Sequence, residues 1–198
     1  MADSLTYAGV ISNVLSSPIV SSILSILAPT FLGYEDLLTK IALVIVGIVI
    51  YGILPFTPTL IRIARREKDI YVSKIEERPR SFIIGISDYI ITFFIFTTLG
   101  LFYYAIFSLT SLIVAALTFA ITLRWKVSIH LIGFCTPLTI LTIISKGIFL
   151  PIFALAPVLM WARVKTQAHN WTQVVVGTFL GIAVTYYSMT WLIQIFNI

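Results

Sequence analysis

Residues 40–61 read KIALVIVGIVIYGILPFTPTLI, and their only charged side chain is Lys40, at the first position. A helix that crosses a bilayer needs about 20 predominantly apolar residues, and this stretch supplies them without a break. The bias extends over the whole chain of 198 residues, of which 59% are hydrophobic and 11% charged. Soluble domains are about 45–50% apolar and about 25% charged, so this composition excludes a soluble domain, a disordered tail and a disulfide scaffold. The sequence therefore predicts an integral membrane protein.

The other apolar stretches predict an all-α, polytopic bundle of six or seven transmembrane helices, in a single domain over residues 1–198. Between residues 81 and 123 the only charge is Asp88, and the length suits two helices with a turn between residues 100 and 108. A further apolar stretch to residue 161 is broken by Lys146 and Gly147, which predicts two short helices. Long apolar stretches without alternation indicate helices rather than strands. The predicted spans cover residues 7–32, 40–61, 81–123 as two helices, 127–161 as two helices, and 171–196; the first, which holds several serines and Pro18, can instead lie in the interface.

The charged residues gather in three polar segments at residues 62–80, 124–126 and 163–170. Two helices separate each segment from the next, so all three are expected at the same face of the membrane. Eleven of the 13 Lys and Arg lie there, and only Lys40 and Lys146 fall at the other face. The positive-inside rule explains this asymmetry and predicts a cytoplasmic face in a cell membrane. An anion-binding site explains it equally, and the two explanations can both hold; nucleic-acid binding does not suit basic loops between apolar stretches.

Both histidines of the chain, His130 and His169, fall at this same predicted face, beside Lys126, Ser128 and Arg163. Cations neutralise phosphate oxygens, one imidazole can attack phosphorus, and the other can protonate the leaving oxygen. These residue types therefore favour phosphoryl transfer. The alternative from the residues alone is a pair of interfacial histidines that anchor helix ends.

Three segments, taken in order along the chain, resemble the motifs of the type-2 phosphatidic acid phosphatase family. Residues 162–177, ARVKTQAHNWTQVVVG, resemble the third motif, an Arg, five residues, a His, three residues and usually an Asp. Residues 126–130, KVSIH, are similar to the second motif, usually Ser-Gly-His, and residues 74–79, KIEERP, to a shortened first motif. The motif-bearing core covers about residues 62–196.

The resemblance implies a metal-independent, cofactor-free lipid phosphatase with a phosphohistidine intermediate, acting on a polyprenyl phosphate or diphosphate or on a phosphatidic-acid-like lipid. It implies a role for each matching residue: nucleophile for His169, general acid for His130, phosphate binding for Lys74, Arg78, Lys126, Ser128 and Arg163. The sequence departs from the motifs at three positions, where Ile129 replaces Gly, Tyr71 replaces Lys, and Gln173 replaces Asp. A Gln carbonyl can still accept the ring N–H of the nucleophile, but it cannot stabilise an imidazolium by charge.

Asp88 is the only acid within a predicted span, and intramembrane acids are costly and usually paired. It is a candidate for the missing negative charge near His169, or else a structural partner for a Tyr, Thr or Lys. The departures from the motifs keep a second class of function open, a non-catalytic protein that binds or transports a lipid phosphate on the same bundle.

Overall fold

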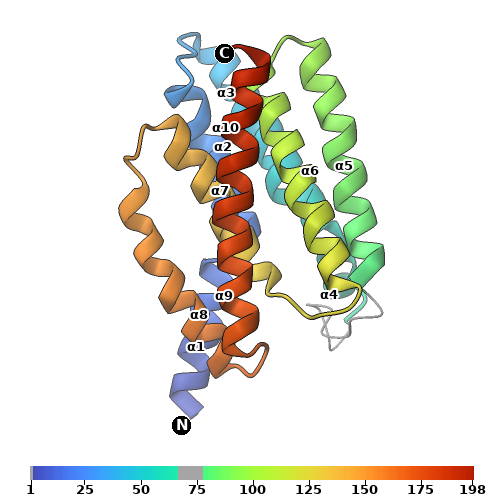
Figure 1. Cartoon of the computed structure of the whole chain (residues 1–198), viewed down its shortest axis with the longest axis vertical. Coiled ribbons are helices and arrows are strands. Elements are labelled where there is room, and N and C mark those ends of the chain that lie inside the picture. The colour runs from blue at the N-terminus through green and yellow to red at the C-terminus, as the bar shows by residue number, and fades with distance from the viewer. Residues whose placement is uncertain (1, 67–77) are drawn as a thin grey trace.

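The computed structural model describes the backbone of residues 2–66 and 78–198 and the side chains of residues 5–66 and 82–198. The described part is all-helical, with 83% helix and no strand, which confirms the predicted fold class. Helices that are adjacent in sequence run up and down a single bundle, with the N-terminus at one end and the C-terminus at the other (Figure 1).

The first half of the bundle contains two long apolar segments, each built from consecutive helical pieces. The first segment breaks at residues 15–16, and the second passes through a π-helical turn, a feature that is rare outside functional or strained positions. The side chain of Asp36 begins the second segment by accepting a hydrogen bond from the Thr39 N–H at 2.7 Å. The elements are α1 (Ala2–Val14), α2 (Ser17–Phe31), α3 (Leu37–Gly47), the π-helix η1 (Ile48–Ile53), the 3₁₀ turn η2 (Leu54–Phe56) and α4 (Thr57–Ala64).

The second half begins with an antiparallel pair joined at Gly100 and ends with a long helix that contains a second π-helical turn. The turn of the pair spans residues 99–101, so the predicted turn region was right at Gly100, while its later residues belong to the second helix. The chain also breaks at Lys146 and Gly147, as predicted. The elements are α5 (Arg78–Thr98), α6 (Phe102–Thr122), α7 (Ile129–Ile144), the 3₁₀ turn η4 (Leu150–Ala154), α8 (Leu155–Lys165), α9 (Trp171–Phe179), the π-helix η5 (Leu180–Val184) and α10 (Thr185–Phe196).

Four helical segments within the described residues are long and apolar enough to cross a membrane. They are Leu5–Phe31, Leu37–Ala64, Phe102–Thr122 and Trp171–Phe196. Two shorter apolar helices, Phe82–Thr98 and Ile129–Ile144, lie among them. The predicted number of six or seven spans is not confirmed, because four segments of the described residues meet both the length and the hydropathy expected of a span.

Small residues bring one face of α2 close to α3, η1 and α7. A Cβ at Gly133 would lie 2.5 Å from the Ser17 Cβ, and one at Gly47 would lie 2.9 Å from the Ser25 Cβ. A glycine that faces a serine lets the two helix backbones approach closely. In a membrane the hydrophobic effect does not drive helices together, so close packing of small residues contributes to their association. Several of the serines that made this stretch an uncertain span therefore pack against neighbouring helices.

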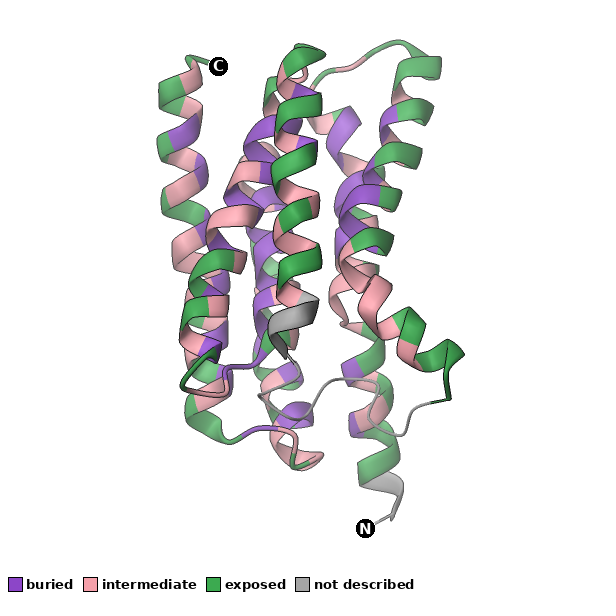
Figure 2. Cartoon of the chain, turned by 90° about the vertical axis from the view of Figure 1, so that its right-hand side faces the viewer, coloured by how far each residue is buried: buried purple, intermediate pink, exposed green. Residues whose placement is uncertain are grey.

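The outer faces of the helices are apolar and exposed, whereas buried positions line the inside of the bundle (Figure 2). Large exposed side chains include Phe94, Phe179 and Trp191, exposed by 61%, 67% and 59%. Exposed apolar surface of this extent suits a lipid environment rather than water. The described structure is thus compatible with a membrane protein.

Candidate functional site

The link between α8 and α9 folds the third motif back on itself. Gln167 adopts a left-handed conformation with φ of 55°, which ends α8 and reverses the chain. The Arg163 carbonyl then accepts hydrogen bonds from the backbone N–H groups of Ala168, at 3.2 Å, and His169, at 3.3 Å. The six positions from Arg163 to His169 therefore span one helix-terminating turn. This turn holds both residues at one end of the bundle.

The ring of His169 is held by Gln173, one turn into α9. Its Nδ1 lies 3.0 Å from the Gln173 Oε1. The same oxygen accepts the backbone N–H of Asn170 at 3.2 Å, which fixes the orientation of the amide. Because this oxygen can only accept, Nδ1 must carry the proton, and the lone pair of the imidazole lies on Nε2. Gln173 thus makes the hydrogen bond expected of it and sets the tautomer that a histidine nucleophile needs.

Asn170 contributes to this arrangement and was missed in the sequence. Its side chain accepts the Gln173 N–H at 2.9 Å, so the two residues form a reciprocal capping box at the start of α9. The signal was present, since an Asn followed three residues later by Gln before an apolar stretch is typical of such a box. Gln173 therefore serves the helix end and the histidine together.

The second motif packs directly against the third. The Ser128 N–H donates to the Gln173 carbonyl at 3.2 Å, and a Cβ on Gly177 would lie 2.7 Å from the Ser128 carbonyl oxygen. The glycine that follows the third motif is thus required by a close backbone approach. The hydroxyl of Ser128 is completely buried, has no hydrogen-bond partner within the described residues, and is absent from the cavity wall. The structure therefore does not bring it to a position where it contacts a ligand.

A cavity of about 350 Å³ extends to this end of the bundle, and its part lined by His130, His169, Arg163 and Lys126 is called the mouth below. His130 and Lys126 reach its wall from the start of α7 and the link before it, and His169 and Arg163 reach it from the end of α8 and the link after it. His169 and Arg163 are each only 8% exposed. Four of the predicted site residues, far apart in sequence, therefore line one cavity.

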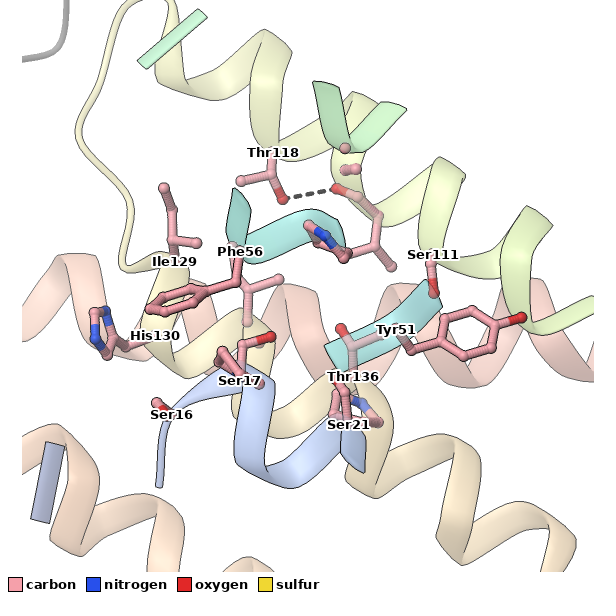
Figure 3. Close-up of a pocket in the computed structure, with 18 of the residues that line it drawn as sticks. Ser16, Ser17, Ser21, Tyr51, Phe56, Ser111, Thr118, Ile129, His130 and Thr136 are labelled. Atoms are coloured by element: carbon pink, nitrogen blue, oxygen red, sulfur yellow. Dashed lines mark hydrogen bonds between the residues drawn. The ribbon is translucent and has the colours of Figure 1, made fainter. Parts of the chain in front are cut away.

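The cavity continues from this mouth into the bundle along α7, on a face that carries His130, Gly133, Thr136 and Ile140. His130 and Ile140 are ten residues apart, or about 15 Å along a helix axis. The inner walls combine apolar side chains with uncharged hydroxyls, several of which are labelled in Figure 3. Those inner lining residues include Ser21, Leu24, Tyr51, Phe107, Ser111, Val114 and Thr118.

Ile129, which replaces the usual glycine of the second motif, is the first residue of α7 and lines the mouth. A β-branched side chain meets no backbone strain at this helical position. The departure therefore narrows the mouth without distorting the chain that carries His130.

The first motif lies at the border of the described residues. Lys74 and Tyr71 fall outside them, and Arg78 is described only as the first backbone position of α5. Their predicted roles in phosphate binding stay predictions.

Asp88 lies on α5 and is absent from the cavity wall, although its neighbours Gly85 and Tyr89 are part of it. One carboxylate oxygen, Oδ2, is buried without a hydrogen-bond partner among residues 5–66 and 82–198. The structure does not bring this acid together with His169, so the Nδ1 proton of the histidine is held by a neutral amide.

Comparison with protein-family models, curated proteins and solved structures gave no match. Within the described residues no three His, Cys, Asp or Glu side chains gather as a metal site would require. The site is therefore interpreted from its own geometry and from the motif resemblance.

Proposed function

We propose that this protein is a membrane-embedded phosphatase of a lipid phosphate or diphosphate. One observation carries the proposal, the cavity that joins His130, His169, Arg163 and Lys126 at its mouth to an uncharged interior. A lipid phosphate is divided in the same way, because its charged headgroup would suit the cationic mouth and its apolar chain the uncharged interior. The volume is within the range of small-molecule sites, about 300–1,000 Å³.

In the proposed first step, the Nε2 lone pair of His169 attacks phosphorus, and the bond between phosphorus and the leaving oxygen breaks. His130 donates a proton to that oxygen, so the lipid alcohol, or the lipid monophosphate when a diphosphate reacts, leaves in a stable form. Arg163 and Lys126 neutralise charge on the phosphoryl oxygens. The product of this step is a phosphohistidine at His169.

In the second step, water attacks the phosphohistidine, and His130 accepts the proton of the attacking water. Inorganic phosphate leaves and the imidazole is restored. Gln173 holds the Nδ1 proton through both steps, which supports the proposal without a carboxylate. The absence of that charge predicts a slower enzyme than one with Asp at this position.

The apolar chain of the substrate would occupy the inner cavity, which favours polyprenyl phosphates and diphosphates or phosphatidic-acid-like lipids with small headgroups. The excess of cations at this end of the bundle predicts that the site faces the cytoplasm in a cell membrane.

The test is phosphate release by the purified protein in detergent with a metal chelator present, over a panel of polyprenyl phosphates, polyprenyl diphosphates and phosphatidic acid. We expect metal-independent release, inhibition by vanadate, and loss of release in His169→Ala. Thr172→Ala, an exposed position three residues further along, is the matched control and should keep wild-type activity. Full activity in His169→Ala, or complete loss on chelation, would overturn the mechanism.

The second candidate is a non-catalytic protein that binds or transports a lipid phosphate. The departures at Ile129 and Gln173, together with the buried hydroxyl of Ser128, favour it. Such a protein would be stabilised against thermal unfolding by the lipid phosphate without forming product. The same panel distinguishes the two classes.

A further inference from the structure

The first helix of the chain reaches the phosphate-binding arginine. The Nη1 of Arg163 donates a hydrogen bond to the Ser12 hydroxyl at 2.7 Å, across 151 positions of sequence. Ser12 is 3% exposed and Arg163 8%, so the bond is shielded from solvent. All three motifs lie in residues 74–177, and nothing in them indicates a contribution from α1.

We propose that Ser12 is a positioning residue of the active site, which orients the Arg163 guanidinium toward the phosphoryl group. This inference rests on the proposed function for the identity of the ligand. The guanidinium is planar and its five N–H donors point in fixed directions, so a hydrogen bond to one nitrogen determines where the others point. Arg163 is also the cation of the mouth that shares a helix-terminating turn with His169.

The surroundings of Ser12 support a contribution to the site as well as to packing. The helix α1 packs along α8, the helix that ends with Arg163. The next residue, Asn13, lines the cavity, and so do Ser16, within the break between α1 and α2, and Ser17, the first residue of α2. In Figure 3, Ser16 and Ser17 lie in the same part of the cavity as His130. The junction of α1 and α2 is therefore one wall of the mouth.

Its hydrogen bonding also distinguishes Ser12 from two other serines of this segment, Ser22 and Ser25. Ser25 and Ser22 return their hydroxyls to carbonyls of their own helix, at Ser21 and Pro18. Ser12 instead holds a charged side chain of another helix. A hydrogen bond to a charged group is stronger than one between neutral groups, and a buried charge deprived of it has to reorganise.

The experiment compares Ser12→Ala with Ser25→Ala, a matched buried serine that is absent from the cavity wall. Thermal stabilisation by orthovanadate gives anion affinity, and lipid-phosphate hydrolysis gives KM and kcat, all on the full-length protein. We expect Ser12→Ala to weaken vanadate binding and raise KM by about 10-fold, the usual effect of a lost hydrogen bond to a charged group. Ser12→Thr, which keeps the hydroxyl, should restore both values, and Ser25→Ala should change neither.

The coupling to Arg163 is measured by a double-mutant cycle. In an Arg163→Ala background, adding Ser12→Ala should leave the vanadate affinity unchanged, because the group that Ser12 orients is already absent. Equal effects in the two backgrounds, or equal effects of Ser12→Ala and Ser25→Ala, would overturn the positioning role. If Ser12→Ala does not fold, Ser12→Cys takes its place, since it keeps the volume and weakens the acceptor.

The two proposals fail in different ways. A wild-type protein that binds vanadate but releases no phosphate would refute the phosphatase, while the vanadate measurements would still test Ser12. A protein that hydrolyses lipid phosphate with unchanged KM and vanadate affinity in Ser12→Ala would refute the positioning role alone.

Discussion

The two ends of the helical bundle use similar local turns for different purposes. At the end that carries the C-terminus, helices are joined by turns at Gly33, Gly100 and Gly147, all in left-handed conformations (Figure 1). Backbone hydrogen bonds close these turns, such as that from the Leu101 N–H to the Phe96 carbonyl at 2.8 Å. Glycine adopts this conformation at no steric cost. These turns reverse the chain through glycine conformation and backbone hydrogen bonds, and the Asp36 side chain caps the helix that follows the first of them.

At the other end, α8 is also terminated by a left-handed residue, but there it is Gln167, and the residues around it include those of the proposed site. The turn holds Arg163 and His169 together, and the packing of Ser128 on Gly177 brings His130 to the same cavity. Cationic and imidazole side chains around a shared cavity therefore distinguish the candidate site from turns that only connect helices.

The largest expected effect is at the mouth, in His130→Ala. Loss of the general acid should lower kcat for a lipid phosphate by about 10²–10⁴-fold. The loss should be much smaller for an aryl phosphate with a good leaving group, because that oxygen departs without protonation. Steady-state kinetics on both substrates measure it, with Ile129→Val, at the neighbouring lining position, as the control. An equal loss on both substrates would contradict the assignment of His130 as the acid.

A smaller effect is expected deeper in the cavity, in Ser111→Phe. The phenyl ring would fill part of the inner cavity that Ser111 and Tyr51 line and would obstruct a long lipid chain. The KM for long polyprenyl phosphates should rise by roughly 10-fold. Short-chain phosphates should be hydrolysed as by the wild type, because the mouth is unchanged. Leu117→Phe, on an exposed face of the same helix, is the control. A chain-length profile that does not change would show that the chain lies elsewhere.

The smallest effect is expected at the opposite end, at the Asp36 cap. Hydrogen bonds from the Thr39 side chain and backbone lower the pKa of Asp36 below its usual value. A lowered pKa in the folded state adds stability that is present above the unfolded pKa and is lost as the pH falls through the folded one. The Tm difference between wild type and Asp36→Ala should therefore be full at pH 7 and begin to shrink only as the pH falls below about 4, the unfolded pKa of Asp.

Asp36→Asn is the matched control for this cap, because Asn caps a helix comparably and does not titrate. Its Tm relative to the wild type should rise on acidification, while its phosphatase activity stays at the wild-type level. Loss of activity in Asp36→Ala without loss of fold would break the distinction between the two ends.

Much of the fold was predictable because apolar length and charge are local properties of the chain. The stretch at residues 40–61 predicted a helical span, and the break at Lys146 and Gly147 was confirmed. The proximity of Arg163 and His169 was also predictable, because only one turn of chain separates the two residues. The number of spans was not, because helix length alone does not establish which short helices cross a membrane.

Other features were decided only by the tertiary structure. The sequence alone does not show that Ser12 contacts Arg163, that the Ser128 hydroxyl is buried, or that Ser128 and Asp88 are absent from the cavity wall. The physical reason is that each of these depends on which helix faces touch, and small-residue contacts such as Ser17 on Gly133 set those faces at long range. An apolar helical chain, with its cations and imidazoles in a few polar links, follows from the order of residues alone, whereas the packing of the helices selects which of those side chains share a cavity.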